Sequence, residues 1–215
     1  MDCHASSFFG VFMRTLPLVF VVAALLLSGC SIPYQTPEAR AQIQQDLGVS
    51  GSDIIDISYT NFCKLKYGDE AICHAEQGIA VLTRKGLILS KYQSSRYVPA
   101  YTLKTAEVLC GHTATSREAA EALNMFTADS NFVLLPLDAD KHWNGMMHRE
   151  MVDYLLADGQ PLLIGTGAKA VRPSGKKKYG GGMIPGAKIP YFTEFEYSEL
   201  VNPCPGAPSD AAHSD

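Results

Sequence analysis

Basic side chains gather in the last third of this 215-residue chain, within a segment that contains no acid. The segment lies between Asp158 and Glu194 and carries Lys169, Arg172, Lys176, Lys177, Lys178 and Lys188. Beside an anionic membrane each such residue contributes about 1 kcal/mol of binding, and glycines at 180–182 allow the backbone to change shape. The pattern predicts a loop at 168–188 that binds anionic envelope lipid or an acidic protein partner. A solvated loop without a ligand explains the same residues more simply.

This region contains residue spacings that resemble a dinucleotide-binding motif and a catalytic serine–lysine pair, but each lacks a feature that its chemistry requires. Residues 165–170 fit G-x-G-x-x-A, yet Pro173 and Gly175 interrupt the helix that would face a pyrophosphate. Ser174 and Lys177 have the spacing of a serine nucleophile and a lysine base. That lysine lies among other lysines and not in the dry cleft that would remove its proton. The sequence therefore predicts neither a dinucleotide site nor a serine hydrolase site here.

The histidines and nearby acids do not form a recognisable metal or catalytic set. His142 and His148 are six residues apart, which is roughly 240° around a helix, so they face different ways. Asp138 and Asp140 are explained as caps of the same helix. We therefore expect no metal and no cofactor. The net charge of −4 gives no reason to expect nucleic acid as a partner.

An apolar run near the start of the chain ends in two small residues and a cysteine. Residues 15–27 follow Arg14 and would make a helix of roughly 20 Å, short for a bilayer span but typical of a signal peptide. Residues 27–30, Leu-Ser-Gly-Cys, resemble the lipobox of bacterial lipoproteins. The resemblance implies a diacylglyceryl group on Cys30 and cleavage just before it. Because Ser31 and not aspartate follows, it also implies the outer membrane, facing the periplasm.

The lipobox divides the chain into segments. Residues 1–12 precede the usual basic start with an acid and an extra cysteine, so we predict that translation begins at Met13. The predicted organisation is a signal peptide at 1–29, a lipidated tether at 30–35, one globular domain at 36–202 and a disordered tail at 203–215. The mature protein is then attached to the membrane through its N-terminal lipid.

Four cysteines follow Cys30, and an exported protein with four thiols is expected to form two disulfides. Three pairings are possible, of which Cys63–Cys73 and Cys110–Cys204 are favoured: the first closes a short arm and the second fixes the C-terminal tail. Each would stabilise the fold by roughly 3 to 5 kcal/mol on the chain-entropy model. Buried free thiols are one alternative. A metal site of Cys63, Cys73 and His74 is another, although its spacing matches no common zinc pattern.

The elements that must position these residues begin with a helix at 36–47, which has Thr36 as cap and Gly48 as stop. A strand at 54–59 and a hairpin of 78–83 with 87–92 follow, and then a strand at 97–109 broken near Pro99. A capping box, T-x-x-E, predicts a helix at 115–126. The remaining predictions are a strand at 132–137, a helix at 142–156 with an apolar methionine surface, and strands at 162–164 and 189–197. The fold class is α+β: a single disulfide-bonded domain, mainly antiparallel sheet, with two or three helices.

The hairpin carries a second resemblance. Residues 80–83, a basic turn with Gly86 and residues 87–89 resemble the pleckstrin-homology-like domains of the GRAM sort. The similar segment, 78–126, is less than a quarter of the chain. A helix at 115–126, ahead of further strands, would depart from the element order of a simple member of that family.

The residues favour a non-catalytic binding or scaffolding module of the bacterial envelope, with the basic loop and the aromatic strand at 191–197 as its surface. An envelope hydrolase whose site assembles from distant residues is the first alternative, and a carrier of lipid or another amphiphile is the second. A deep pocket that joins a histidine to a carboxylate would favour the hydrolase. A closed apolar cavity would favour the carrier.

Overall fold

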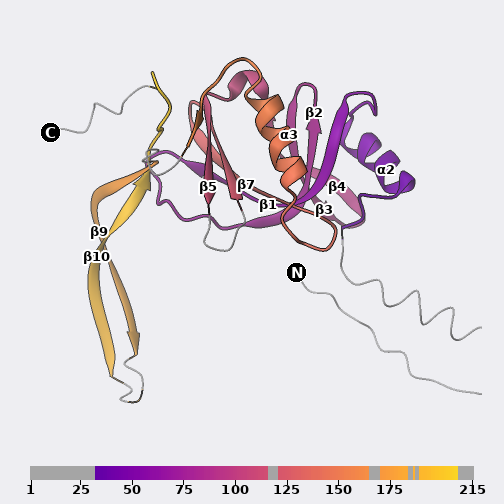
Figure 1. The fold of residues 1–215 in the computed structure, drawn as a ribbon. Helices are drawn as coiled ribbons and strands as arrows, with labels where there is room; N and C mark the ends of the chain where they lie inside the picture. Colours follow the sequence, from indigo (N-terminus) through magenta and orange to yellow (C-terminus); the bar gives the residue numbers. More distant parts are fainter. Residues whose placement is uncertain (1–31, 116–120, 165–169, 184–185, 187–188, 208–215) are drawn as a thin grey trace, which may run out of the picture. The chain divides into compact units, whose positions relative to one another are not determined.

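The structure is a computed structural model that describes residues 32–115, 121–164, 170–183, 186 and 189–207. Within them one mixed sheet of eight strands has the order β4-β3-β2-β1-β7-β6-β5-β8, and a second sheet pairs β9 with β10 (Figure 1). Every pairing is antiparallel except that of β5 with β8. The strands are β1 Ile54–Lys66, β2 Glu76–Thr83, β3 Gly86–Gln93, β4 Arg96–Lys104, β5 Cys110–Thr115, β6 Glu121–Phe126, β7 Ser130–Leu137, β8 Leu162–Leu163, β9 Val171–Met183 and β10 Pro190–Leu200.

Strand β1 joins the two halves of the large sheet. Its first part, from Ile54 to Phe62, pairs with β2, while its second part, from Tyr59 to Lys66, pairs with β7. The strand is therefore longer than the 54–59 predicted. The predicted hairpin of 78–83 with 87–92 is confirmed as β2 and β3, with Thr83 opposite Gly86 at the turn.

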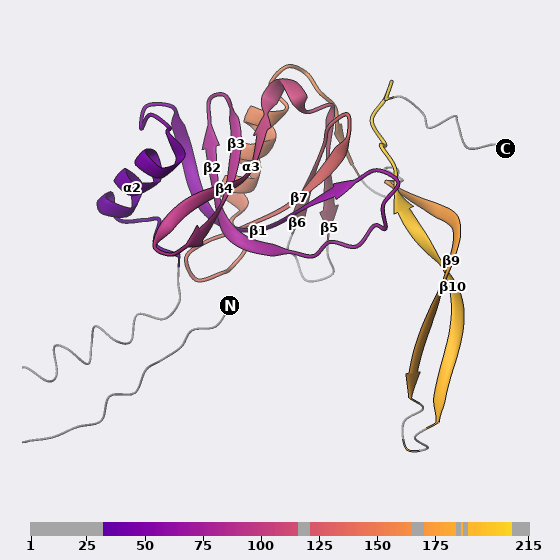
Figure 2. The same ribbon diagram turned by 180° about the vertical axis from the view of Figure 1, so that it is seen from behind.

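Two α-helices cover different residues of the sheet. Helix α3, Gly145–Leu155, packs on a core that includes Ala80 and Leu82 of β2. Helix α2, Pro37–Leu47, packs on Ile79 and Val81 of the same strand through Ile43 (Figures 1 and 2). Because side chains alternate between the two faces of a strand, β2 is buried on both faces. A 3-10 turn, Thr105–Glu107, follows β4.

Helix α2 has the termini that the sequence predicts. Thr36 Oγ1 accepts a hydrogen bond from Ala39 N at 3.2 Å, and Gly48 ends the helix with φ of 63°, which glycine adopts without strain. Near its end Asp46 accepts from Tyr97 N at 2.9 Å, and from Arg96. The Tyr97 bond is the main reason that the pKa of Asp46 lies below its usual value.

The helix predicted at 115–126 is wrong, because residues 121–126 form β6, which pairs with β5 and β7. Leu123, Met125 and Phe126 are fully buried in this strand. The prediction rested on helical spacing of Ala119, Ala122, Leu123 and Phe126. A six-residue apolar stretch fits the pattern of a helix as well as that of a strand. Pairing with β5 and β7 makes this stretch a strand. Of the predicted capping box, Thr115 is the last residue of β5, and Glu118 lies outside the described residues.

The loop predicted at 168–188 is also wrong over most of its length. Residues 171–183 form β9, and β10 lies opposite them. The predicted strand at 189–197 is confirmed in the main as β10. Strand β4 likewise ends at Lys104 and not at 109, with an irregular register beside Pro99, where a break was predicted.

Helix α3 begins later than the predicted 142 and has a different cap. Asn144 Oδ1 accepts from Met147 N at 3.1 Å, whereas Asp138 accepts from the amides of Asp140 and His142, both at 2.9 Å, in the preceding turn. Neither aspartate that we predicted as cap therefore caps the helix. Met147 and Met151 are core residues as expected, but Met146 is 71% exposed.

Both predicted disulfides are present. Cys63 is bonded to Cys73, at the end of β1, and Cys110 at the start of β5 is bonded to Cys204 beyond β10. The second bond lies in a small apolar cluster with Phe126. Of the described helices, none has the length and apolar character needed to cross a bilayer.

Candidate binding surface

Strands β9 and β10 form a two-stranded ribbon of their own, and this hairpin contains most of the predicted binding residues (Figure 1). The register runs from Val171 opposite Leu200 to Met183 opposite Pro190, with an irregularity beside Tyr197. Nearly all of its side chains are exposed, and only Glu199 and Leu200 at the base of β10 are buried. The hairpin therefore presents two faces and its outer edges to solvent.

The base of the hairpin is fixed to the segment that follows β1. Gly68 N donates to Leu200 O at 2.9 Å, and Ala71 N donates to Ser198 O at 3.0 Å. Glu70 forms an isolated bridge with Glu199. The Cys63–Cys73 disulfide closes this same segment. The disulfide therefore restrains the part of the domain on which the hairpin stands.

The two faces of the hairpin differ in their side chains. Phe192, Tyr179 and Met183 share one face by register and are 80%, 76% and 61% exposed. The other face carries Tyr191 and Phe195, which are about half-exposed. Exposed apolar side chains in such number mark a contact surface more often than a solvated one. Sequence reasoning had included the aromatic residues of β10 but not Tyr179 or Met183, because it treated their segment as a loop.

The basic residues are less available than the sequence implied. Arg172 Nε lies 2.7 Å from Glu199 Oε1. Lys177 forms an ion pair with Glu194, and Lys178 forms one with Glu70. The ammonium group of Lys178 also lies 4.7 Å from the ring centre of Tyr197. Lys176 is exposed and makes no ion pair with a described residue. Lys169 and Lys188 lie outside the described residues.

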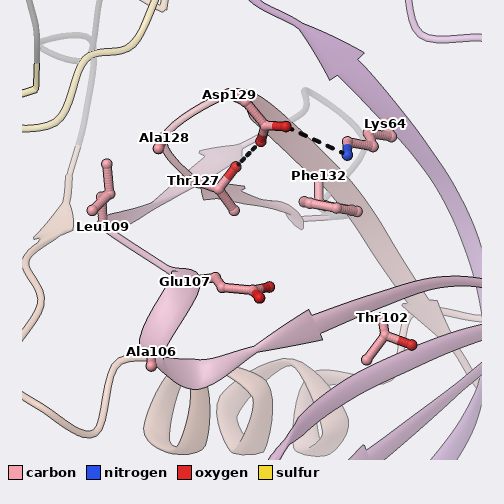
Figure 3. Close-up of a pocket in the computed structure, with 9 residues that line it drawn as sticks. All are labelled: Lys64, Thr102, Ala106, Glu107, Leu109, Thr127, Ala128, Asp129 and Phe132. Carbon is pink, nitrogen blue, oxygen red and sulfur yellow. Dashed lines mark hydrogen bonds and ion pairs between the residues drawn. The ribbon is translucent and has the colours of Figure 1, made fainter.

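A cavity of about 370 Å³ lies between β1, β4 and β7 (Figure 3). Glu107 points toward its centre from the 3-10 turn, and Lys64, Asp129 and Phe132 line the opposite side. Hydrogen bonds from Ser130 and Thr127, both 2.8 Å, hold the pKa of Asp129 below its usual value. No histidine, cysteine or serine lines the cavity. Its polar lining consists of Lys64, Thr102, Glu107, Thr127 and Asp129.

The histidines lie apart from that cavity. His148 is buried against Trp143, with ring centres 5.8 Å apart, while His142 is exposed and lies 3.8 Å from Asp138. Potential ligand atoms of Asp138, Asp140 and His142 lie within 4.8 Å of one another. Hydrogen bonding of the turn already accounts for this cluster, so it carries no further argument.

A pair of carboxyl groups, Glu150 on α3 and Asp56 on β1, joins the helix to the sheet. Burial of Glu150, followed by the nearby charge of Asp56 and a hydrogen bond to it, raises the pKa of Glu150 above its ordinary 4.5. The folded state therefore binds this proton more tightly than the unfolded chain does. The resulting stabilisation is fully present below pH 4.5 and is lost as the pH rises through the raised pKa.

Glu150→Gln is accordingly expected to raise the melting temperature at pH 7, because an amide can donate to Asp56 without adding a charge. Below pH 4.5, where Glu150 is protonated, the difference from the wild type should vanish. Thermal unfolding at both pH values measures it, with the exposed Asp158→Asn as control. A lower melting temperature of the Gln variant at pH 7 would contradict the argument.

Comparison with known proteins gives no relative from which a role could be transferred. No protein-family model matches the chain, and no curated protein matches it. A role for the chain has therefore to be inferred from its surface.

Proposed function

We propose that this chain is a bacterial envelope lipoprotein, anchored through Cys30 to the outer membrane and facing the periplasm. Its domain acts as a non-catalytic binding or scaffolding module, and the β9–β10 hairpin is its binding surface. The observation that carries this proposal is the exposure of aromatic residues on both faces of that hairpin, led by Phe192 and Tyr179. Tyrosine, phenylalanine and methionine provide large contact areas when a partner covers them.

The energetics of the hairpin support a binding role. A two-stranded ribbon alone is marginally stable in water, and three or more strands or a packed face are needed for independent stability. This ribbon has ion pairs and a fixed base, but no helix or second sheet covers its distal half within the described residues. A partner that packs on the aromatic side chains would supply the missing face.

The charges of the hairpin indicate the chemistry of that partner. Arg172, Lys177 and Lys178 are already paired with acids of this chain. The hairpin therefore presents little unpaired positive charge, and exposed apolar side chains make up more of its surface. We therefore propose an acidic protein partner with an apolar contact site, held by Lys176 and the aromatic residues. Anionic lipid is the alternative ligand with negative charge, and the experiment below distinguishes an acidic protein partner from lipid.

Other observations bear on the envelope location and the fold relationship. Two disulfides are typical of proteins outside the cytosol, as the lipobox resemblance implies. The relationship of 78–126 to GRAM-like domains is also part of the proposal. Residues 121–126 are a strand and not the predicted helix, but α3 is still followed by β8, β9 and β10, so the order of elements departs from that of a simple member.

One experiment in the native envelope tests both parts of the proposal. Cells that express the wild type or Cys30→Ser are labelled with palmitate, fractionated and chemically cross-linked. The wild type should carry the label, fractionate with the outer membrane and cross-link to a different protein, whereas Cys30→Ser should lose the label and the membrane fraction. An unlabelled wild type would overturn the lipid anchor.

The hairpin is tested by Lys176→Glu combined with Phe192→Ala. This variant removes Lys176, which makes no ion pair with a described residue, and Phe192, the most exposed ring among the described residues of the hairpin. It should therefore lose the cross-linked partner while keeping the label. The matched control is Arg84→Glu with Tyr154→Ala, which changes an exposed cation and an exposed ring elsewhere. Equal cross-linking in the two variants would overturn the hairpin as binding surface. Binding to anionic vesicles without a protein partner would assign it to lipid.

A further inference from the structure

The outer edge of β9 is bare over its distal part. Within the described residues β9 pairs only with β10, so its other edge presents unpaired N–H and C=O groups. Residues 179–183 read Tyr-Gly-Gly-Gly-Met. The three glycines have no side chains that could hinder an approaching strand. Such an edge is a template for pairing with another chain.

The aromatic residues of β10 cover the faces of this glycine run. A Cβ built on Gly180 would lie 2.8 Å from the ring of Phe195, and one on Gly181 would lie 2.8 Å from the ring of Phe192. Tyr191 similarly lies 3.0 Å from the Cβ position of Gly182. These rings fill the space above the glycines, as aromatic residues do beside glycines of an edge strand. The contacts are on the faces, so they leave the edge open.

The base of the same strand is protected, in contrast to its distal part. Pro173 lacks an N–H, three successive lysines follow Gly175, and the register is irregular there. Proline, lysine and bulges are the usual means by which edge strands avoid pairing. Their absence from residues 179–183 restricts an edge contact to that segment.

We propose that residues 179–183 pair antiparallel with the same residues of a second copy of this chain. With the two-fold axis at Gly181, glycine faces glycine in the centre, and Tyr179 lies opposite Met183 of the second copy. No charged residue falls within this register, and a ring and a thioether meet at each end, a favourable contact. The result is a continuous four-stranded sheet, which meets the strand number that independent stability requires.

The other edge of the hairpin is less suited to such a contact, because its strand begins at Pro190, which lacks an N–H, and carries Glu194 and Glu196. A two-fold axis at Phe195 of β10 would place Glu194 opposite Glu196 of the second copy, and like charges in that position are unfavourable. The base of β10 is also bridged to Glu70. The homotypic contact therefore belongs to β9. It goes beyond the proposed function, because it uses the edge of the hairpin, while the proposed partner contacts its faces.

Charge substitution at the two ends of the segment tests the register. Tyr179→Lys with Met183→Lys places two ammonium groups opposite each other at each end of the contact, so the purified mature protein in detergent should be monomeric at all concentrations. Tyr179→Lys with Met183→Glu places opposite charges there and should restore the dimer. Both variants set the new ammonium group at 179 opposite Glu194 of the same hairpin, so they are matched in fold.

Sedimentation velocity over a dilution series measures the fraction of dimer, and circular dichroism verifies that both variants fold as the wild type does. The wild type should dissociate on dilution, the first variant should show no dimer, and the second should equal or exceed the wild type. A monomeric wild type, or the same behaviour in both variants, would overturn the proposal. Since the measurement uses purified protein alone, its failure would leave the cross-linking result for the hairpin faces unaffected.

Discussion

Replacing both Cys110 and Cys204 with alanine is expected to lower the free energy of unfolding by about 5 kcal/mol. The two residues are 94 positions apart in the sequence, so their bond removes a large loop entropy from the unfolded chain. It also connects the start of β5 to the segment after β10. Alanine is the suitable replacement because Cys110 is fully buried beside Phe126. Urea unfolding followed by circular dichroism gives the value.

The second disulfide provides a matched control for this prediction. Cys63 and Cys73 are separated by only 10 residues, and the same entropy argument gives about 3 kcal/mol for alanine at both. The long-range pair should therefore be the more costly of the two to remove. Equal losses for the two double variants would show that loop entropy is not the main source of the stabilisation.

The parts of the fold that sequence reasoning predicted well are those with local signals. Thr36, Pro37 and Gly48 define both ends of α2 without help from the rest of the chain. The β2–β3 hairpin is similarly local, since two apolar strands flank one short turn. The disulfide pairing followed from an oxidising compartment and from which segments each bond would join.

The parts that it missed are decided by partners far away in the sequence. Residues 121–126 are apolar and short, so their own pattern fits a helix as well as a strand, and β5 and β7 settle the outcome. The basic segment was predicted as a loop because glycine and lysine have low strand propensity. Aromatic rings of β10 lie over those glycines and make the segment a strand.

Contacts between segments that are distant in the sequence also explain why the predicted basic loop differs from the observed hairpin. The sequence shows no acid between Asp158 and Glu194, yet the fold pairs Lys177 with Glu194 and Lys178 with Glu70. A basic loop thus becomes a hairpin whose charges are largely balanced. Its exposed apolar and aromatic side chains, and its bare edge, are then the features that distinguish it from ordinary surface.

Met125→Ala is expected to lower the free energy of unfolding by about 2 to 5 kcal/mol, because it leaves a cavity in the main core. Met125 is fully buried in β6 and belongs to the cluster under α3. Met125 was not among the residues whose helical spacing predicted a helix at 115–126. The substitution therefore also distinguishes the strand from the helix.

Met146→Ala is the control, since the same side chain at this position is 71% exposed. Its effect should stay within about 0.5 kcal/mol, as is usual for surface positions. Urea unfolding of both variants gives the comparison. Similar small losses for both would show that residues 121–126 do not pack as a strand, and the hydrophobic core built on β6 and α3 would then have to be revised.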